Sequence, residues 1–283
     1  MAHSLEIPCP AKVNLHLSVL GRRPDGYHEL ITLMQPVGLF DEISLTLGGE
    51  GISLRCDSPA VPCGEDNLAC KAARLFQQET GRRFGLEIRL RKRIPVAAGL
   101  GGGSSDAAAV LLGLNRLFGE EIPLEVLARW AVLLGADVPF FLLGGPALGM
   151  GIGEKLERVR ILPQLWFLLL SPGWPVSTKW AYDNLDLGLT RGAKGIKIPH
   201  LIAEAEEIIQ LLHNDLESVT ARQHVWVPRA KERLAGSGAA GVLMSGSGPT
   251  VFGLFLDEES ARRAMSCLVL EEGESVWLAK GLC

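Results

Sequence analysis

The chain has 283 residues, of which 47% are hydrophobic and 21% are charged, and its formal net charge is −4. This composition is typical of a folded protein with one large or two ordinary domains, and the slight acidic excess argues against nucleic acid as the main partner. The chain has no signal-peptide pattern, no apolar run of membrane-spanning length and no paired framework among its six cysteines, so we expect a cytoplasmic protein without a membrane partner.

The first predicted element is a strand over residues 11–20, where apolar and polar side chains alternate strictly. Successive side chains of a strand point to opposite faces, so one face is apolar and the other is polar. The polar face carries Lys12, Asn14, His16 and Ser18. We therefore expect a half-buried strand, followed by further strands near residues 30–39, 42–47, 51–56 and 85–90.

Three helices are predicted in the middle of the chain. Asp66-Asn67 is a capping pair for a helix that runs to about Thr80 and ends at Gly81. A second helix is expected over residues 105–118. Pro123 opens a third, which ends at Gly135.

The second half of the chain mixes the two kinds of element. Strands are expected near residues 147–150, 166–170, 241–245, 250–256 and 274–279. Helices are expected from Pro199 through about His213, near 226–235 and near 258–268. The glycine-rich and charged stretch over 149–160 suggests a change of domain, so we predict an α+β protein in two lobes, residues 1–155 and 156–283.

One segment points directly to chemistry. Residues 94–109 read IPVAAGLGGGSSDAAA, with glycines at 99, 101, 102 and 103 before the hydroxyls of Ser104 and Ser105. Glycines allow backbone N–H groups to turn toward a ligand, and a helix start offers unpaired N–H groups and a positive dipole end. The segment is therefore predicted to bind an anion, most often phosphate, and the simpler alternative is an ordinary serine-capped helix.

Two common phosphate motifs do not fit. A P-loop needs Gly-x4-Gly-Lys-Ser/Thr, and the nearest spacing, Gly21 to Gly26, is followed by Tyr27-His28. The letters Gly-x-Gly-x-x-Gly occur at residues 236–241, but a helical pattern precedes them and a strand pattern follows. A dinucleotide site has the reverse order, so an oxidoreductase is disfavoured.

The glycine segment resembles the second motif of the GHMP kinase family, named for galactokinase, homoserine kinase, mevalonate kinase and phosphomevalonate kinase. Two further stretches resemble the other family motifs: residues 10–15 (PAKVNL) and residues 245–252 (SGSGPTVF). The resemblance implies a nucleotide-binding N-terminal lobe, a ferredoxin-like C-terminal lobe and an active site in the cleft between them.

Within the family, Gly26-Tyr27-His28 and Gly135-Ala-Asp-Val-Pro139 resemble members whose acceptor carries a cytidine diphosphate group. The resemblance implies a kinase that moves the γ-phosphate of ATP, with Mg²⁺, to the 2-hydroxyl of that small molecule, in non-mevalonate isoprenoid precursor synthesis. A monomer or weak homodimer is expected.

The resemblance also assigns catalytic roles. Asp137 would be the base for the acceptor hydroxyl, although its position between a glycine and a proline also suits a turn-forming aspartate. Lys12 would pair with Asp137 and stabilise developing charge, although a lysine on a polar strand face is ordinarily exposed. Asn14 shares the face of Lys12 and would donate to the substrate.

Five residues are implied on the cytidine side. Tyr27 would stack on cytosine and His28 would hydrogen-bond its edge, although both also read as loop surface residues. Thr178 falls at a substrate-contact position. Tyr182 falls at the position of a second aromatic wall, for which Trp180 is a competing candidate.

On the ATP side, Asn67 resembles an adenine-contacting asparagine, and it is also a simple helix cap. Lys92 matches a family position near the nucleotide, although a charge run such as Arg91-Lys92-Arg93 is usually a solvated face. The N–H groups at 101–105 would hold the β- and γ-phosphates, and Ser104 or Ser105 would add a hydroxyl or reach Mg²⁺. The residues identify no further metal ligand.

Two alternatives stay open at this point. The chain could be another small-molecule kinase of the family, of the mevalonate or homoserine type, which Gly26-Tyr27-His28 disfavours. It could also be a non-catalytic nucleotide-binding regulator of the same fold, which the presence of both Lys12 and Asp137 disfavours because a regulator needs no base.

Overall fold

The computed structural model describes residues 4–190 and 197–283. The helices in these residues are α1 (Leu68–Thr80), α2 (Gly102–Leu117), α3 (Leu124–Leu134), α4 (Val138–Leu143), α5 (Thr178–Asp183), the 3₁₀ turn η1 (Leu187–Leu189), α6 (Ala205–Leu211), α7 (Glu217–Gln223), α8 (Trp226–Gly236) and α9 (Glu258–Cys267). The strands are β1 (Ser4–Arg22), β2 (His28–Leu47), β3 (Ile52–Cys56), β4 (Leu86–Arg91), β5 (Ala147–Gly151), β6 (Lys155–Arg158), β7 (Arg160–Ile161), β8 (Trp166–Ser171), β9 (Leu201–Ile202), β10 (His213–Asn214), β11 (Gly241–Met244), β12 (Val251–Phe255) and β13 (Ser275–Lys280). No described helix meets the length and apolarity needed to cross a membrane.

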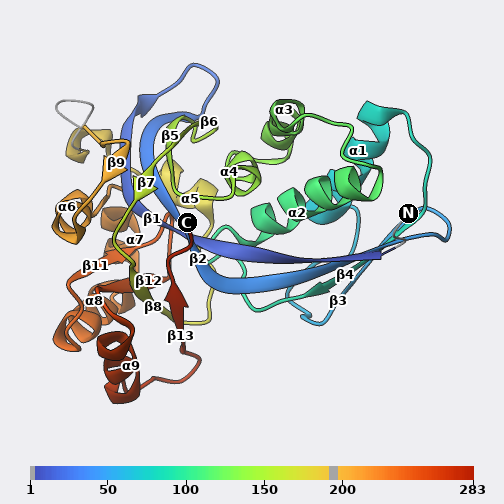
Figure 1. Ribbon diagram of the computed structural model, residues 1–283. Helices are drawn as coiled ribbons and strands as arrows, with labels where there is room; N and C mark the ends of the chain where they lie inside the picture. The colour runs from blue at the N-terminus through green and yellow to red at the C-terminus, as the bar shows by residue number, and fades with distance from the viewer. Residues whose placement is uncertain (1–3, 191–196) are drawn as a thin grey trace. The chain divides into compact units, whose positions relative to one another are not determined.

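Two long strands, β1 and β2, organise the larger sheet (Figure 1). Its path is β10-β1-β2-β4-β3, and β5 joins β2 to β6 alongside. β2 runs antiparallel to β4, with Ile43 opposite Leu90, whereas β1 runs parallel to β10, with His16 opposite His213. The second sheet has the order β11-β12-β8-β13 and is antiparallel at each pairing.

Contacts divide the chain into two compact units whose segments interleave. Unit 1 takes the chain up to Ala11, Phe40–Val96 and Gly101–Gly144, and unit 2 takes Lys12–Leu39, Ala97–Leu100 and Gly145–Cys283. β1 and β2 therefore each contribute residues to both units. The boundary expected between residues 155 and 156 stays a prediction.

In unit 1 the four helices α1 to α4 pack on one another beside the strands β3 and β4 (Figure 1). α2 lies against α1 and α4, and its residues Ala107–Leu111 are buried. Phe76 of α1 centres an aromatic cluster, 5.9 Å from the Phe118 ring and 6.1 Å from the Trp130 ring. These apolar contacts hold the starts of α1, α2 and α4 in one body.

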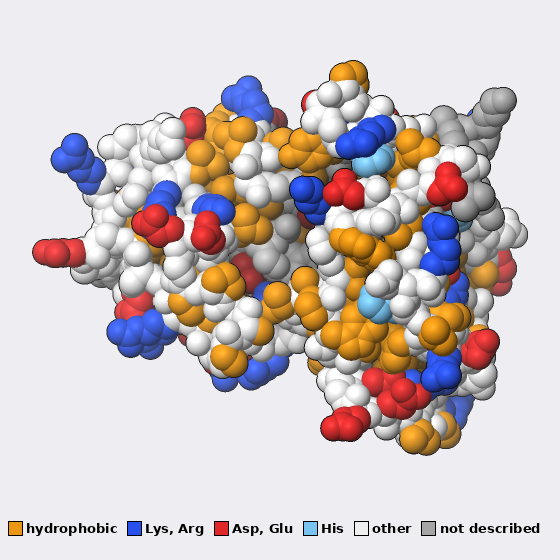
Figure 2. All heavy atoms as spheres, turned by 180° about the vertical axis from the view of Figure 1, so that it is seen from behind, with side chains coloured by type: hydrophobic (Ala, Val, Ile, Leu, Met, Phe, Trp, Pro, Cys, Tyr) orange, Lys and Arg blue, Asp and Glu red, His pale blue; other side chains and the backbone are white. Residues whose placement is uncertain are grey.

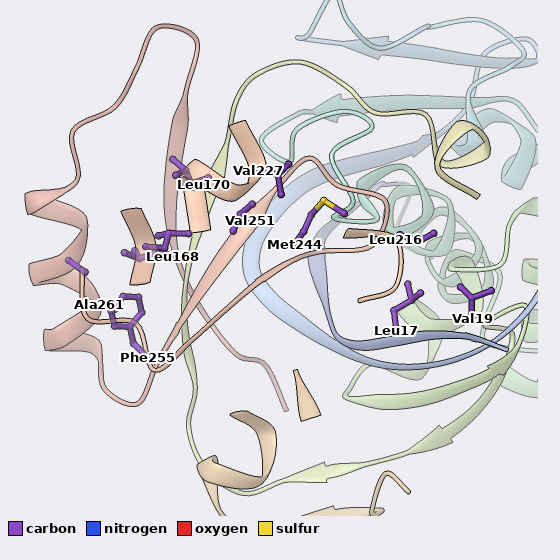
Figure 3. Close-up of a cluster of buried hydrophobic side chains, with 13 residues drawn as sticks. Leu17, Val19, Leu168, Leu170, Leu216, Val227, Met244, Val251, Phe255 and Ala261 are labelled. Carbon is purple, nitrogen blue, oxygen red and sulfur yellow. The ribbon is translucent and has the colours of Figure 1, made fainter. Parts of the chain in front are cut away.

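In unit 2 a buried cluster joins the antiparallel sheet to the helices that cover it (Figure 3). Leu168 and Leu170 of β8, Val251 of β12 and Ala261 of α9 are among its members. Leu17 and Val19, the apolar face of β1, belong to the same cluster. Burial of apolar surface is the main stabilising contribution here, at about 25 cal/mol per Å² removed from water.

Local rules predict several element ends correctly. α1 begins after Asn67, whose Oδ1 accepts from the Ala69 N–H at 2.9 Å, and it ends at Gly81 with φ +65°. α3 follows Pro123 and ends at Gly135, as expected. α8, α9 and the strands β8, β11, β12 and β13 also lie where the pattern predicts them.

Other expectations are wrong. The predicted strands 30–39 and 42–47 are one continuous strand, β2, because Asp41 in the predicted gap is buried and hydrogen-bonded. The helix expected from Pro199 begins only at Ala205, where Glu204 and Glu207 form a capping box. The helices α5 and α7 were not predicted; with six and seven residues, they are too short to show a clear period.

Candidate active site

The glycine-rich segment leads into α2, which begins three residues earlier than its sequence predicts. Gly101 is the N-cap at φ +71°, and Gly102 is the first helical residue. The Ser105 N–H donates to the Gly101 carbonyl at 2.9 Å, so Ser105 already takes part in the helix. The N–H groups of Gly102, Gly103 and Ser104 precede this first intrahelical bond and suit an anion.

The two serines differ in access. Ser104 is half-buried, whereas Ser105 is buried and its Oγ makes no hydrogen bond within the described residues. Ser104 is therefore the more accessible hydroxyl of the two. Ser105 is the orphaned polar atom that a bound group or water would satisfy.

Unit 2 contains the other end of the glycine segment, residues 97–100, bound to two other motifs. The Lys12 N–H donates to the Leu100 carbonyl at 2.9 Å, and the Ser245 hydroxyl donates to the Gly99 carbonyl at 2.9 Å. Gly99 has φ +79°, and a Cβ there would lie 2.0 Å from the Ser245 carbonyl oxygen. Only glycine fits this approach. The three family motifs therefore meet at the backbone of residues 99 and 100, through one backbone hydrogen bond and one from the Ser245 hydroxyl.

Lys12 and Asn14 lie together on β1, as the alternation predicts. The Lys12 Nζ donates to Asn14 Oδ1 at 2.5 Å, and Asn14 Nδ2 donates to Thr32 Oγ1 at 2.8 Å. The expectation of a half-buried strand is wrong, however, because the polar face is also buried, at 4% exposure for Lys12 and 3% for Asn14. A buried ammonium and amide held in a fixed geometry are typical of a functional site.

The third motif turns against these two residues. A Cβ on Gly246 would lie 3.2 Å from Asn14 Oδ1 and 3.5 Å from Lys12 Nζ. The Ser247 hydroxyl lies 3.1 Å from that of Thr178, at the start of α5. The structure therefore brings Lys12, Asn14, Gly99 and Thr178 to the third motif within unit 2.

Sequence reasoning missed the residues that hold this turn. The buried Asn214 donates through Nδ2 to the carbonyls of Met244 at 2.8 Å and Gly246 at 2.7 Å. The Thr220 hydroxyl donates to the Ser247 carbonyl at 3.1 Å. Both residues lie in a stretch without recognisable motif, and an asparagine directly after an apolar helical run is the only local signal.

The cytidine-side residues form a second group in unit 2. Tyr27 lies in the turn after β1 and is 60% exposed. His28 is buried, and its ring stacks on Tyr182, with centroids 5.2 Å apart and planes at 26°. Trp180 lies instead 6.4 Å from His224, so Tyr182 is the aromatic residue that the structure brings to His28.

The pKa of His28 is lowered from its ordinary value. Burial of the imidazole is the main cause, the nearby positive charge of Arg22 adds to it, and Asp183 opposes it. His28 is therefore neutral at physiological pH, with one ring nitrogen as donor and the other as acceptor. Such a ring suits the edge of a neutral base.

In unit 1 the predicted residues occupy starts of helices or the end of a strand. Asn67 caps α1, and its Nδ2 donates to the Pro62 carbonyl at 2.8 Å. Asp137 directly precedes α4 and makes no side-chain capping bond there. Lys92 follows β4, and its ammonium is buried between the carboxylates of Asp41 and Asp106. The solvated face expected as the alternative for Lys92 is therefore wrong.

On the face in Figure 2, basic and acidic side chains are interspersed rather than gathered by sign. Within the described residues, no group of three or more histidine, cysteine or acidic side chains is arranged to hold a metal ion.

The profile of the GHMP kinase N-terminal domain matches residues 67–145, and that of the C-terminal region matches residues 199–274. The chain belongs to the GHMP kinase family. It is 49% identical over 265 residues to the 4-diphosphocytidyl-2-C-methyl-D-erythritol kinase of Syntrophotalea carbinolica, covering 93% of this chain and 94% of that one. The enzyme of the same name from Geobacter metallireducens is also 49% identical, over 92% of both chains.

Solved structures agree with this assignment. A crystal structure of 4-(cytidine 5'-diphospho)-2C-methyl-D-erythritol kinase superposes with a TM-score of 0.82 at 38% identity, over 99% of this chain and 100% of that one. Homoserine kinase from Cytophaga hutchinsonii, at 20% identity over 100% of this chain and 96% of that one, shares the fold with a TM-score of 0.68.

Proposed function

We propose that this chain phosphorylates the 2-hydroxyl of 4-diphosphocytidyl-2-C-methyl-D-erythritol with ATP, forming the 2-phosphate and ADP, in non-mevalonate isoprenoid precursor biosynthesis. The observation that carries the proposal is 49% identity, over more than nine tenths of both chains, to relatives of that name. The mevalonate and homoserine alternatives have weaker support, because a structure of L. major mevalonate kinase shares the fold at only 16% identity and the homoserine kinase at only 20%.

The donor phosphates bind at the start of α2. The N–H groups of Gly102, Gly103 and Ser104 hold the β- and γ-phosphates, and the dipole of α2 favours their negative charge. The adenine lies near Asn67. The roles of Gly99 and Gly101 are conformational, since their positive φ values shape the segment that leads into the helix.

The acceptor hydroxyl is activated by Asp137. Its carboxylate takes the proton while the hydroxyl oxygen bonds to the γ-phosphorus and the bond to the bridging oxygen of ADP breaks. Lys12 stabilises the charge that develops on the transferred group. Asn14 orients the Lys12 ammonium through the 2.5 Å hydrogen bond and offers its amide to the substrate.

Magnesium fits the oxygen-rich start of α2. When bound with ATP, it neutralises charge on the phosphates. The hydroxyls of Ser104 and the orphaned Ser105 are the oxygens that this chain offers there, and Mg²⁺ commonly takes its remaining ligands from phosphates and water.

The cytidine group selects the acceptor. Tyr27 offers an exposed ring for stacking on cytosine, and the neutral His28 hydrogen-bonds the base edge. Tyr182 supports His28 from behind through ring stacking, and Thr178 contacts the substrate beside Ser247. A small-molecule reaction of this kind involves neither membrane nor nucleic acid, and we place it in the cytoplasm, carried out by a monomer or weak homodimer.

The substrate assignment is tested by ATP consumption with three acceptors in parallel: the cytidine substrate, mevalonate and homoserine. We expect turnover with the cytidine substrate alone, because Tyr27 and His28 have no role toward the other two. Turnover with mevalonate or homoserine at a comparable rate would replace the proposal by the corresponding alternative.

The catalytic assignment is tested with Lys12→Ala and Asp137→Ala. Each is expected to reduce kcat by roughly 100-fold or more, because each removes a group that acts on the transferred phosphate or the proton. Lys155→Ala, an exposed residue of β6, is the control and should retain wild-type turnover. Near-normal kcat in both test variants, with folding confirmed by circular dichroism, would refute the assignment.

A further inference from the structure

A buried ionic cluster joins three segments of unit 1. Lys92, just after β4, forms ion pairs through Nζ with Asp41 of β2 and, at 2.9 Å, with Asp106 of α2. Their side chains are 7%, 0% and 4% exposed, in that order. Two carboxylates and one ammonium are thus removed from water together, which is costly unless each group is paired.

The cluster contacts the backbone that precedes the glycine-rich segment and the helix that follows it. The second oxygen of Asp41 accepts from the N–H groups of Arg93 at 2.6 Å and Ile94 at 2.8 Å. Asp106 lies in α2, one residue after Ser105. Lys92 therefore connects the residues that enter the glycine-rich segment with the helix that leaves it.

Gly102 shows how closely the cluster underlies the first turn of α2. A Cβ at Gly102 would lie 2.9 Å from Lys92 Nζ and 3.2 Å from Asp41 Oδ2. The absence of a side chain at this position lets the helix start rest directly on the ammonium. A displacement of Lys92 or Asp41 would therefore act directly on the backbone at Gly102.

The ionisation of Asp106 depends on opposing effects of burial and of the neighbouring charges. Burial raises the pKa of Asp106 to about 7, the Lys92 charge opposes this rise, and the Asp41 charge adds to it. Burial likewise raises the pKa of the neighbouring Cys9 thiol, which stays neutral. Asp106 Oδ1 has no hydrogen-bond partner within the described residues, so Lys92 provides the main stabilisation of an ionised Asp106.

We propose that Lys92 is a positioning residue, which holds the start of α2 in place for nucleotide phosphates by pairing with Asp41 and Asp106 rather than by contacting the nucleotide. The inference rests on the proposed function only in that the start of α2 binds the phosphates of ATP. Direct contact would require the ammonium to leave two buried carboxylates, which would then repel each other.

The proposal is tested by a double-mutant cycle of Lys92→Met, Asp106→Asn and the double variant, with Lys155→Met as the exposed control. The measurement is the Kd for ADP with Mg²⁺ and no acceptor, obtained by calorimetry. At about pH 9 we expect Lys92→Met to weaken binding roughly tenfold or more, because two buried carboxylates lose their cation. The double variant should regain most of that loss, since it removes one of them.

The pH dependence supplies a second readout. Loss of the Lys92 charge raises the pKa of Asp106 further above 7, so in Lys92→Met this carboxyl is neutral at about pH 7 and ionised only at clearly alkaline pH. The affinity defect of Lys92→Met should therefore shrink from about pH 9 to about pH 7, while the defect of the double variant should not depend on pH.

Two results would overturn the proposal. The first is unchanged ADP affinity in Lys92→Met. The second is a double variant whose denaturation midpoint recovers while its ADP affinity does not, which indicates direct contact by the ammonium. If Lys92→Met does not fold, Asp41→Asn replaces it: positioning requires weaker ADP binding, and direct contact predicts unchanged binding. Turnover of the cytidine substrate by the wild-type chain is measured separately. Its absence would refute the proposed function, whereas the ADP affinities test the positioning role of Lys92.

Discussion

Tyr27 and His28 are neighbours in the chain but have opposite environments. The Tyr27 side chain is 60% exposed, while the His28 ring is buried against Tyr182. An exposed aromatic ring beside a fixed neutral imidazole is a stacking platform next to a hydrogen-bonding edge. In the proposed recognition of cytosine, Tyr27 is the residue whose surroundings would change on binding, because His28 is already buried.

Tyr27→Ala should raise KM for the cytidine substrate roughly five- to 150-fold and leave KM for ATP unchanged, because stacking of a base on an aromatic ring contributes about 1–3 kcal/mol. Steady-state kinetics with each substrate varied in turn measures both constants. Trp180→Ala is the matched control, since its ring lies by His224 and not by His28. A rise in both KM values for Tyr27→Ala would contradict the stacking role.

At the scale of the element, two glycines with left-handed backbone conformations differ in the space around them. Gly99 and Gly81 both have positive φ, +79° and +65°, but their surroundings differ. A Cβ on Gly81 would meet nothing within 4 Å, whereas one on Gly99 would lie 2.0 Å from the Ser245 carbonyl. Gly81 is therefore required for its backbone conformation alone. Gly99 is required for its conformation and also because no side chain fits at its position.

Gly81→Ala should lower the free energy of unfolding by about 1–2 kcal/mol, the cost of a side chain in the left-handed region, and leave kcat/KM unchanged. Gly99→Ala should lower it further and also reduce kcat/KM, because the third motif must move away. Urea denaturation and steady-state kinetics on the two variants make the comparison. Equal effects of the two substitutions on both quantities would show that the approach to Ser245 has no functional weight.

At the scale of the whole molecule, β1 and β2 are shared covalently between the two units. β1 passes from unit 1 to unit 2 at Lys12, and β2 passes back at Phe40, each without a break in the strand. Leu17 of β1 belongs to the core of unit 2, and Ile43 of β2 is fully buried in unit 1. Loss of either core therefore releases a strand that the other unit also uses.

We expect a single cooperative unfolding transition, with a calorimetric enthalpy equal to the van't Hoff enthalpy. Leu17→Ala and Ile43→Ala, one in each unit, should both shift that one transition to lower temperature, each by a destabilisation of about 2–5 kcal/mol. Differential scanning calorimetry is the measurement. Two separate transitions, each sensitive to only one of the variants, would show instead that the units unfold independently.

The same three scales explain which predictions succeed. The cap at Asn67 and the end at Gly81 depend on residues within one turn, and both are confirmed. The start of α2 is missed by three residues, because nothing local distinguishes a glycine in a loop from a glycine in the first turn of a helix. The helix expected from Pro199 is wrong because Pro199 precedes a short strand, and the capping box at Glu204 sets the true start.

The sequence by itself determined the period of β1, the caps of α1 and membership of the GHMP kinase family, and it led to the proposal that the glycine segment binds phosphate. These depend on spacing within a few residues, which sequence records directly. Only the tertiary structure decided that the polar face of β1 is buried, that Lys92 lies between Asp41 and Asp106, and that Asn214 holds the third motif. The ion pairs of Lys92 and the hydrogen bond from Asn214 to Gly246 join residues 14 to 51 positions apart in the chain. These contacts stabilise the protein only once the fold has brought the groups together.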